Sequence, residues 1–66
     1  MMPKYPEIHV DLSEQDGNGF FIIGRVSKAL RCAAIDRDEI KKFQDQAMSG
    51  DYNHLLRTVM DWVSVS

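Results

Sequence analysis

This sequence has few of the residues from which small proteins build covalent or metal cross-links. Its 66 residues include one cysteine, Cys32, and two histidines. A single cysteine excludes a disulfide within the chain and favours a reducing, cytoplasmic environment. His9, Cys32 and His54 fall on three different expected elements, which is not the spacing of a zinc site. We therefore expect neither a metal nor a cofactor.

Long apolar runs and charge of one sign are also lacking. No apolar run approaches the roughly 18 residues of a membrane span, and no charged start leads into an apolar stretch with a small-residue cleavage site. The 8 basic and 10 acidic residues leave a net charge of −2, so we expect no general attraction to nucleic acid or to anionic membranes. A chain of this length is one domain at most and buries only about 60% of its unfolded surface. Its stability then requires self-association or a well-packed helical core.

The charge is distributed unevenly along the chain. Residues 1–16 carry one lysine against four acidic residues, residues 17–35 carry three basic residues and no acidic one, and residues 36–66 carry four basic against six acidic residues. The middle segment is therefore the only basic part of the sequence.

A half-buried strand is predicted over residues 7–12. Polar and apolar side chains alternate strictly there, in the order Glu7, Ile8, His9, Val10, Asp11 and Leu12. Such alternation is typical of a strand with one face on the core. A lone strand leaves its hydrogen-bonding edges unsatisfied, and three partners are open: a second strand at Trp62–Val65, the same strand of a second copy, or helices across which the segment merely lies. Because the last helix uses Trp62, pairing between copies is favoured.

A helix is predicted over Gly19–Ala34, and the rest of the chain is expected to pack onto it. At about 100° per residue, one broad apolar face carries Ile22, Ile23, Val26, Ala29, Leu30 and Ala33, which is typical of a core-facing helix. Gly24 lies inside this helix, where glycine costs about 0.5–1 kcal/mol relative to alanine. With Ser27 nearby, one interpretation is a close approach of another backbone, and the other is that Gly24 has no role.

The opposite side of this helix carries a mixed aromatic and basic stripe. Phe21, Arg25, Lys28 and Cys32 follow one another at spacings of four, three and four, and Arg31 flanks them. A phenyl ring among cations suggests a partner surface, for example for an anion or a nucleic acid. The alternative is that the helix is contacted on two sides, with Phe21 covered by the N-terminal segment. Aromatic residues near helix starts often pack under the leading loop, which favours this alternative.

Two further helices are predicted after the central one. Asp36 is expected as the N-cap of a helix that runs to about Met48, with Glu39 completing a capping box. Gly50 is expected to end this helix in the left-handed conformation. Its buried residues are expected to be Ile40, Phe43 and Ala47. In the third helix, capped by Asp51, the expected apolar face comprises Tyr52, Leu55, Leu56, Val59, Met60, Trp62 and Val63.

The segment Ser13–Gly19 is a polar loop in which Asp16 or Asn18 can cap the following helix. Glu14, Asp16 and Asn18 also have the spacing of the first ligands of a calcium loop. The twelfth position of such a loop should be a bidentate glutamate, and here it is Arg25. A polar turn that leads into a helix is therefore the favoured interpretation.

Three stretches that cover nearly the whole chain, KYPEIHVDL, DGNGFFIIGRVSKALR and SGDYNHLLRTVMDWVSV, resemble a set of short uncharacterised proteins of bacterial and phage genomes. The resemblance implies a free-standing small cytoplasmic protein of phage or prophage origin. It implies no activity and no site residues.

The sequence thus predicts one α+β domain over residues 1–66, with an N-terminal strand followed by three short helices. The first functional hypothesis is a non-enzymatic interaction module, either a homodimer or the binder of a protein partner, that uses the strand edge at residues 7–12 and the stripe. The second is a weak nucleic-acid or anion binder that uses Arg25, Lys28 and Arg31, with Phe21 for stacking. Nucleic acid is disfavoured because the last helix holds one arginine against two aspartates, unlike a recognition helix. An enzyme is not expected, since no pair of titratable groups shares a plausible pocket.

Overall fold

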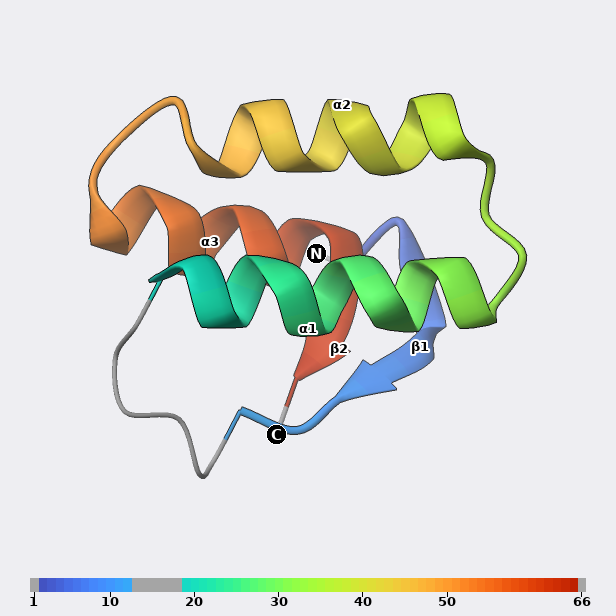
Figure 1. Ribbon diagram of the computed structural model, residues 1–66. Coiled ribbons are helices and arrows are strands. Elements are labelled where there is room, and N and C mark those ends of the chain that lie inside the picture. The colour runs from blue at the N-terminus through green and yellow to red at the C-terminus, as the bar shows by residue number, and fades with distance from the viewer. Residues whose placement is uncertain (1, 13–18, 66) are drawn as a thin grey trace.

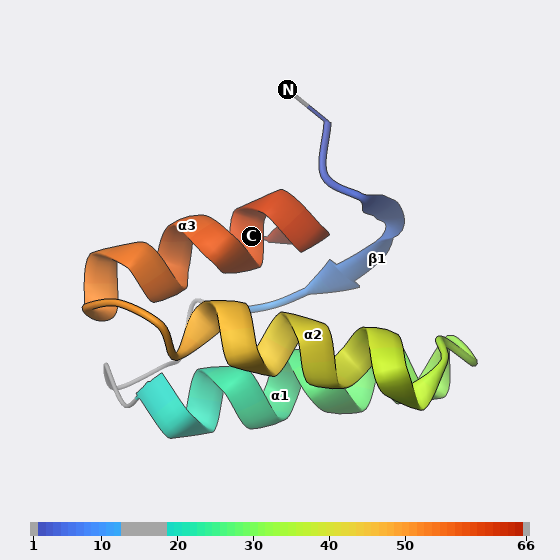
Figure 2. The same ribbon diagram turned by 90° about the horizontal axis from the view of Figure 1, so that it is seen from above.

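The computed structural model describes residues 2–12 and 19–65. Its elements follow in the order β1 (Tyr5–Val10), α1 (Gly19–Cys32), α2 (Arg37–Ala47), α3 (Tyr52–Trp62) and β2 (Val63–Val65). Figure 1 shows α2 on one side of the neighbouring helices α1 and α3, and the two strands on the other side. Seen from above in Figure 2, α2 lies between α3 and α1. The predicted α+β arrangement is confirmed, while the expected caps at Asp16 and Asn18 and the calcium-like spacing that begins at Glu14 lie outside the described residues.

The two strands are parallel neighbours. Their register pairs Tyr5 with Val63, His9 with Ser64 and Val10 with Val65, with an irregularity between the first two pairs. The tail at the end of the chain is therefore the partner that β1 has within its own chain. Pairing between copies, which the sequence favoured, remains a prediction for the other edge of the strand.

Alternation along β1 fixes which side chains enter the core. Ile8 and Val10 are buried, and Glu7 and His9 between them are exposed. This matches the predicted period of two, although the strand begins at Tyr5 rather than at Glu7. The sheet therefore packs one face on the helices and leaves the other face polar.

The core lies where the three helices meet the sheet. Its buried apolar residues are Ile8, Val10, Ile22, Ile23, Val26, Leu30, Ile40, Phe43, Ala47, Leu55, Val59, Trp62 and Val63. The helical period of α1 predicted four of these correctly, but Ala33 is exposed and Ser27 is buried. The Ser27 hydroxyl accepts a hydrogen bond from Nε2 of Gln44 at 2.9 Å, so this buried polar group is satisfied. On α3, Tyr52 and Met60 are exposed instead of buried.

A residue in the left-handed conformation follows α1, at Ala34, and not α2, where the sequence predicted it at Gly50. Ala34 has φ 64°; its N–H donates to Arg31 O at 3.0 Å, and the N–H of Ile35 donates to Leu30 O at 3.0 Å. These two bonds are the Schellman pattern of a helix end. Gly50 does not have a positive φ, so the expected left-handed conformation there is wrong. Packing explains the glycine at this position instead, because a Cβ at Gly50 would lie 2.7–2.9 Å from side-chain atoms of His54.

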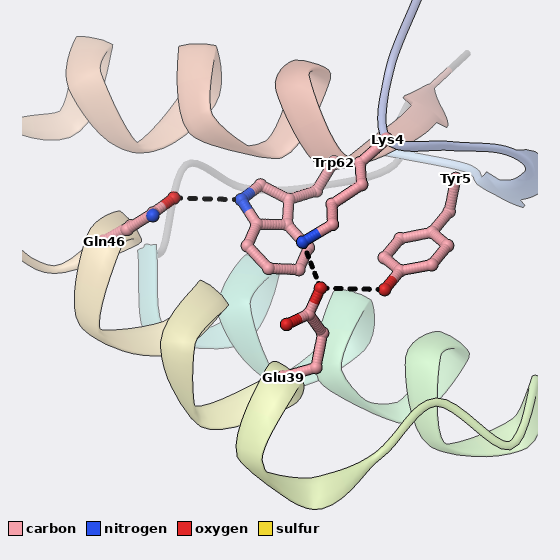
Figure 3. A network of polar contacts seen from close by, with 5 residues as sticks. All are labelled: Lys4, Tyr5, Glu39, Gln46 and Trp62. Atoms are coloured by element: carbon pink, nitrogen blue, oxygen red, sulfur yellow. Dashed lines mark hydrogen bonds and ion pairs between the residues drawn. The ribbon is translucent and has the colours of Figure 1, made fainter.

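A polar network ties the N-terminal segment to α2 and α3 (Figure 3). The Glu39 carboxylate forms an ion pair with Lys4 and accepts a hydrogen bond from the Tyr5 hydroxyl at 2.9 Å. The ammonium of Lys4 also lies 4.6 Å from the centre of the Trp62 ring, and Nε1 of Trp62 donates to Oε1 of Gln46 at 3.0 Å. The predicted capping box is therefore wrong, because the side chain of Glu39 is used by the N-terminal segment.

The same contacts shift three titrations. Hydrogen bonds from Lys4 and then from Tyr5 lower the pKa of Glu39. The hydrogen bond to Glu39 raises the pKa of Lys4. Burial, and after it the hydrogen bond to Glu39, raises the pKa of Tyr5. All three shifts favour the protonation states that hold the network together.

Candidate functional site

The side of α1 that faces away from the core gathers aromatic and basic side chains. We define the α1 outer face by its seven exposed residues, Phe20, Phe21, Gly24, Arg25, Lys28, Arg31 and Cys32. Five of them are the residues of the predicted stripe. Phe20 is 80% exposed and Phe21 is 51% exposed. The preference for a Phe21 covered by the N-terminal segment is therefore wrong, since half of this residue faces solvent.

The N-terminal half of this face is hollowed. The Gly24 hollow, as we name it, has a volume of about 570 Å³ and is lined by Phe20, Phe21, Gly24, Arg25 and Lys28. Phe20 and Lys28 stand one turn before and one turn after Gly24, so their side chains border the same strip of the helix surface. Apart from the two chain neighbours and the backbone of α1 itself, no atom lies within 4 Å of the position where a Cβ would stand on Gly24, which excludes the close approach of another backbone considered from the sequence.

Arg25 fixes one wall of the Gly24 hollow. Its guanidinium lies 5.5 Å from the centre of the Phe21 ring, within the range of a cation–π contact. Its Nη1 donates to Asp11 O at 3.1 Å. Arg25 thus links the end of the N-terminal strand segment to the aromatic part of the α1 outer face, so the fold holds a cation and a phenyl ring together there.

A second hollow lies at the corner between α1 and α2. This corner hollow has a volume of about 610 Å³ and is lined by Arg31, Ile35, Arg37, Ile40, Lys41 and Gln44. Lys41 is 3.4 Å from the carboxylate of Asp45. Arg31 and Arg37 form no ion pair with any residue in ranges 2–12 and 19–65. The positive charge of the α1 outer face therefore continues onto the start of α2.

Acidic residues border this positive region at both ends. Asp11 adjoins Arg25 through the hydrogen bond to its carbonyl, and Asp36 and Asp38 are exposed beside Arg37 at the start of α2. The basic strip is therefore short and has acidic residues near both of its ends. Such a strip suits a ligand with a few negative charges better than a long polyanion.

A serine and a histidine that lie close together elsewhere have a structural role. Oγ of Ser49 lies 3.1 Å from Nε2 of His54, but it donates to Gln46 O at 2.7 Å. Nε2 of His54 is 2.9 Å from the same carbonyl. Because a carbonyl oxygen only accepts, this contact is a hydrogen bond in the tautomer in which Nε2 carries the proton, and in that tautomer Nε2 is not a base toward Ser49. Both side chains cap the C-terminal end of α2.

The remaining predicted residues do not join the hollows. Cys32 is an exposed free thiol at the end of the α1 outer face. In the strand-edge set, Asp11 and Leu12 lie beyond the end of β1. Within the described ranges, no three His, Cys, Asp or Glu side chains are grouped as metal ligands would be, and none of the helices there is long and apolar enough to cross a membrane.

Two residues of the site were not identified from the sequence as part of a surface. Phe20 was not assigned to the stripe, and Gly24 was considered only for backbone packing. Their signal was the row Phe20, Gly24 and Lys28 at intervals of four, which places the three on one line of a helix.

Comparisons with protein-family models, with curated proteins and with solved structures found no match to this chain.

Proposed function

We propose that this chain is a non-enzymatic protein-interaction module that binds an acidic segment of another protein on the α1 outer face. The observation that carries the proposal is the pair of exposed rings, Phe20 and Phe21, beside Arg25 and Lys28 around a hollow. Aromatic residues and arginine are enriched in the central parts of protein interfaces and among their energetic hot spots. A single thiol, Cys32, supports an intracellular location.

Charge selects the partner. The α1 outer face carries three cations and no acidic residue, so a two-fold contact of this face with itself would oppose like charges. A homodimer through the edge of β1 that does not face β2 remains a separate prediction. A partner segment with carboxylates complements Arg25 and Lys28 directly. A nucleic acid, the alternative, would extend past the short basic strip toward Asp11 at one end and Asp36 at the other.

The test is a titration of the ¹⁵N-labelled chain, followed by the backbone amide signals. The probes are a synthetic peptide with one central tryptophan between flanking glutamates, the same peptide with lysines in place of the glutamates, and an oligothymidylate of similar length. We expect the acidic peptide to shift the signals of residues 20–28 and the lysine peptide to leave them unchanged.

Two variants separate this surface from the rest of the molecule. Lys28→Glu should weaken binding of the acidic peptide by about tenfold or more, because it opposes like charges. Lys42→Glu makes the same change on α2 at an exposed residue that lines neither hollow, and it should change binding less than about twofold. Equal affinities for these two variants, or no shifts with the acidic peptide, would refute the proposal. Binding of the oligothymidylate alone, weakening steeply between about 50 and 200 mM salt, would replace it by the nucleic-acid alternative.

A further inference from the structure

The glycines of the described chain differ in what surrounds them. A Cβ on Gly19 would lie 3.2 Å from Cδ1 of Leu55, and a Cβ on Gly50 would lie 2.7–2.9 Å from atoms of His54. Packing therefore explains why both positions are small. Apart from its two chain neighbours and the backbone of its own helix, a Cβ on Gly24 would have no atom within 4 Å, and the φ of Gly24 is not in the positive range. Neither packing nor backbone conformation requires a glycine at this position.

Helix formation also disfavours a glycine there. Gly24 lies in the interior of α1, which runs from Gly19 to Cys32, and glycine is among the weakest helix formers. Alanine fits the same space without a contact and would stabilise the helix. What an alanine would change is the surface: its methyl group would stand on the floor of the Gly24 hollow, between the side chains of Phe20 and Lys28.

We infer that Gly24 is the position that selects the partner, because it leaves bare backbone on which one large apolar side chain of the acidic segment is seated. This inference rests on the proposed function and adds the chemistry of the contact. Phe20 and Phe21 supply aromatic walls for that side chain, and tryptophan or leucine has a size that uses them. Arg25 and Lys28 then face the carboxylates on either side of it in the partner sequence.

The experiment compares two acidic peptides on three forms of the chain. The peptides carry a central tryptophan or a central alanine between the same glutamates, and fluorescence anisotropy of a dye on the peptide gives Kd. The forms are the unchanged chain, Gly24→Ala, and Asn53→Ala. The last is a matched control, because Asn53 is exposed on α3, outside the α1 outer face, and lines neither hollow.

On the unchanged chain we expect the tryptophan peptide to bind about tenfold or more tightly than the alanine peptide. Gly24→Ala should weaken the tryptophan peptide by about tenfold, since an added methyl group in a filled contact forces the ligand out of place. The same variant should raise Tm by about 2–8 °C, because alanine favours the helix. Asn53→Ala should leave both affinities within about twofold.

The failures of the two proposals are distinct. If Gly24→Ala binds the tryptophan peptide as tightly as the unchanged chain does, while Lys28→Glu still weakens it, the role of Gly24 is refuted and the α1 outer face is retained. Equal binding of the tryptophan and alanine peptides refutes the seated apolar side chain in the same way. Loss of binding in both Gly24→Ala and Asn53→Ala would show a general effect on the fold and would also refute the inference. No binding of either peptide to any form overturns the proposed function itself.

Discussion

Exchanging two residues of the α1 region should stabilise the protein without changing its composition. Glycine stands at position 24 in the helix interior, and alanine stands at position 34 with φ 64°. Each is the residue that the other position favours, because alanine promotes helix and glycine adopts positive φ without steric strain. The double variant Gly24→Ala/Ala34→Gly places each residue where its backbone preference is met.

The magnitude follows from these two local environments. Gly24→Ala should gain about 0.5–1 kcal/mol, because nothing within 4 Å opposes the new methyl group. At Ala34 the left-handed conformation costs a residue with a Cβ roughly 1–2 kcal/mol. The greater freedom of glycine in the unfolded chain takes back about 0.4–1 kcal/mol of that gain. The two sites are ten residues apart in the sequence, which is more than two helical turns, so their effects should add to roughly 1–2 kcal/mol.

Urea unfolding followed by tryptophan fluorescence can measure this change. Trp62 is the only tryptophan and is 4% exposed in the core, so its emission reports on unfolding of the packed state. The total free energy of unfolding for a chain of this length is about 3–10 kcal/mol, and the expected gain is a measurable part of it. If Gly24→Ala alone lowers the urea midpoint, Gly24 has a structural role. The reasoning for both the exchange and the Gly24 hollow would then be refuted.

Two further predictions concern packing and pH. Gly50→Ala should destabilise the protein by about 1–3 kcal/mol, because the new methyl group meets the His54 side chain at 2.7–2.9 Å and displaces a capping ring; an unchanged urea midpoint would contradict this. Because the pKa of Glu39 is lowered on folding, its stabilising effect is present above the ordinary carboxyl pKa and is lost as pH falls through the lowered value. Because the pKa values of Lys4 and Tyr5 are raised, their effects are present below the ordinary values and are lost as pH rises through the raised ones. Urea midpoints across pH should fall on both sides, and Glu39→Gln should flatten the acid side; a variant with the same acid limb would contradict the assignment.

Periodicity was sufficient to predict β1, the three helices and most of the core, whereas β2 was only one of the alternatives left open for the C-terminal residues. Burial of Ile22, Val26 and Leu30 on α1, and of Phe43 on α2, follows directly from the helical period. The same reasoning fails where a burial decision depends on another element. Ser27 is buried because Gln44 of α2 satisfies its hydroxyl, and the sequence contains no local sign of that pair.

Helix ends were less predictable because distant residues compete for their side chains. Glu39 has the spacing of a capping box with Asp36, but Lys4 and Tyr5 bind its carboxylate instead, and Tyr5 is 34 positions away in sequence. Gly50 has the identity of a left-handed C′ residue, yet Ala34 adopts that conformation. For Glu39 a tertiary contact decided the outcome, whereas Ala34 takes the left-handed conformation through local backbone hydrogen bonds at the end of α1.

The stripe was identified from its spacing, but its proposed function depends on the open space at Gly24. Phe21, Arg25 and Lys28 could be placed on one side of a helix from their order alone. The sequence could not show whether Gly24 allows a tight contact with another element or leaves an open hollow on the surface, because glycine is suited to both. Gly19 is the contrasting case on the same helix, since a Cβ there would lie 3.2 Å from Cδ1 of Leu55. Only the neighbours from other elements show that Gly19 lies at a tight contact and that Gly24 lies at an open surface.

The opposition between stability and binding at Gly24 gives the proposed site its strongest physical support. A residue that weakens its own helix, and that no neighbour requires, lies between the two most exposed phenylalanines and two cations. Ala34 shows that a backbone mismatch alone does not identify a site, since it ends a helix and lines neither the Gly24 hollow nor the corner hollow. What distinguishes Gly24 is that replacing it with alanine would place a methyl group in the Gly24 hollow. Substitution there should therefore raise stability and lower affinity together, whereas Ala34→Gly should raise stability and leave affinity unchanged.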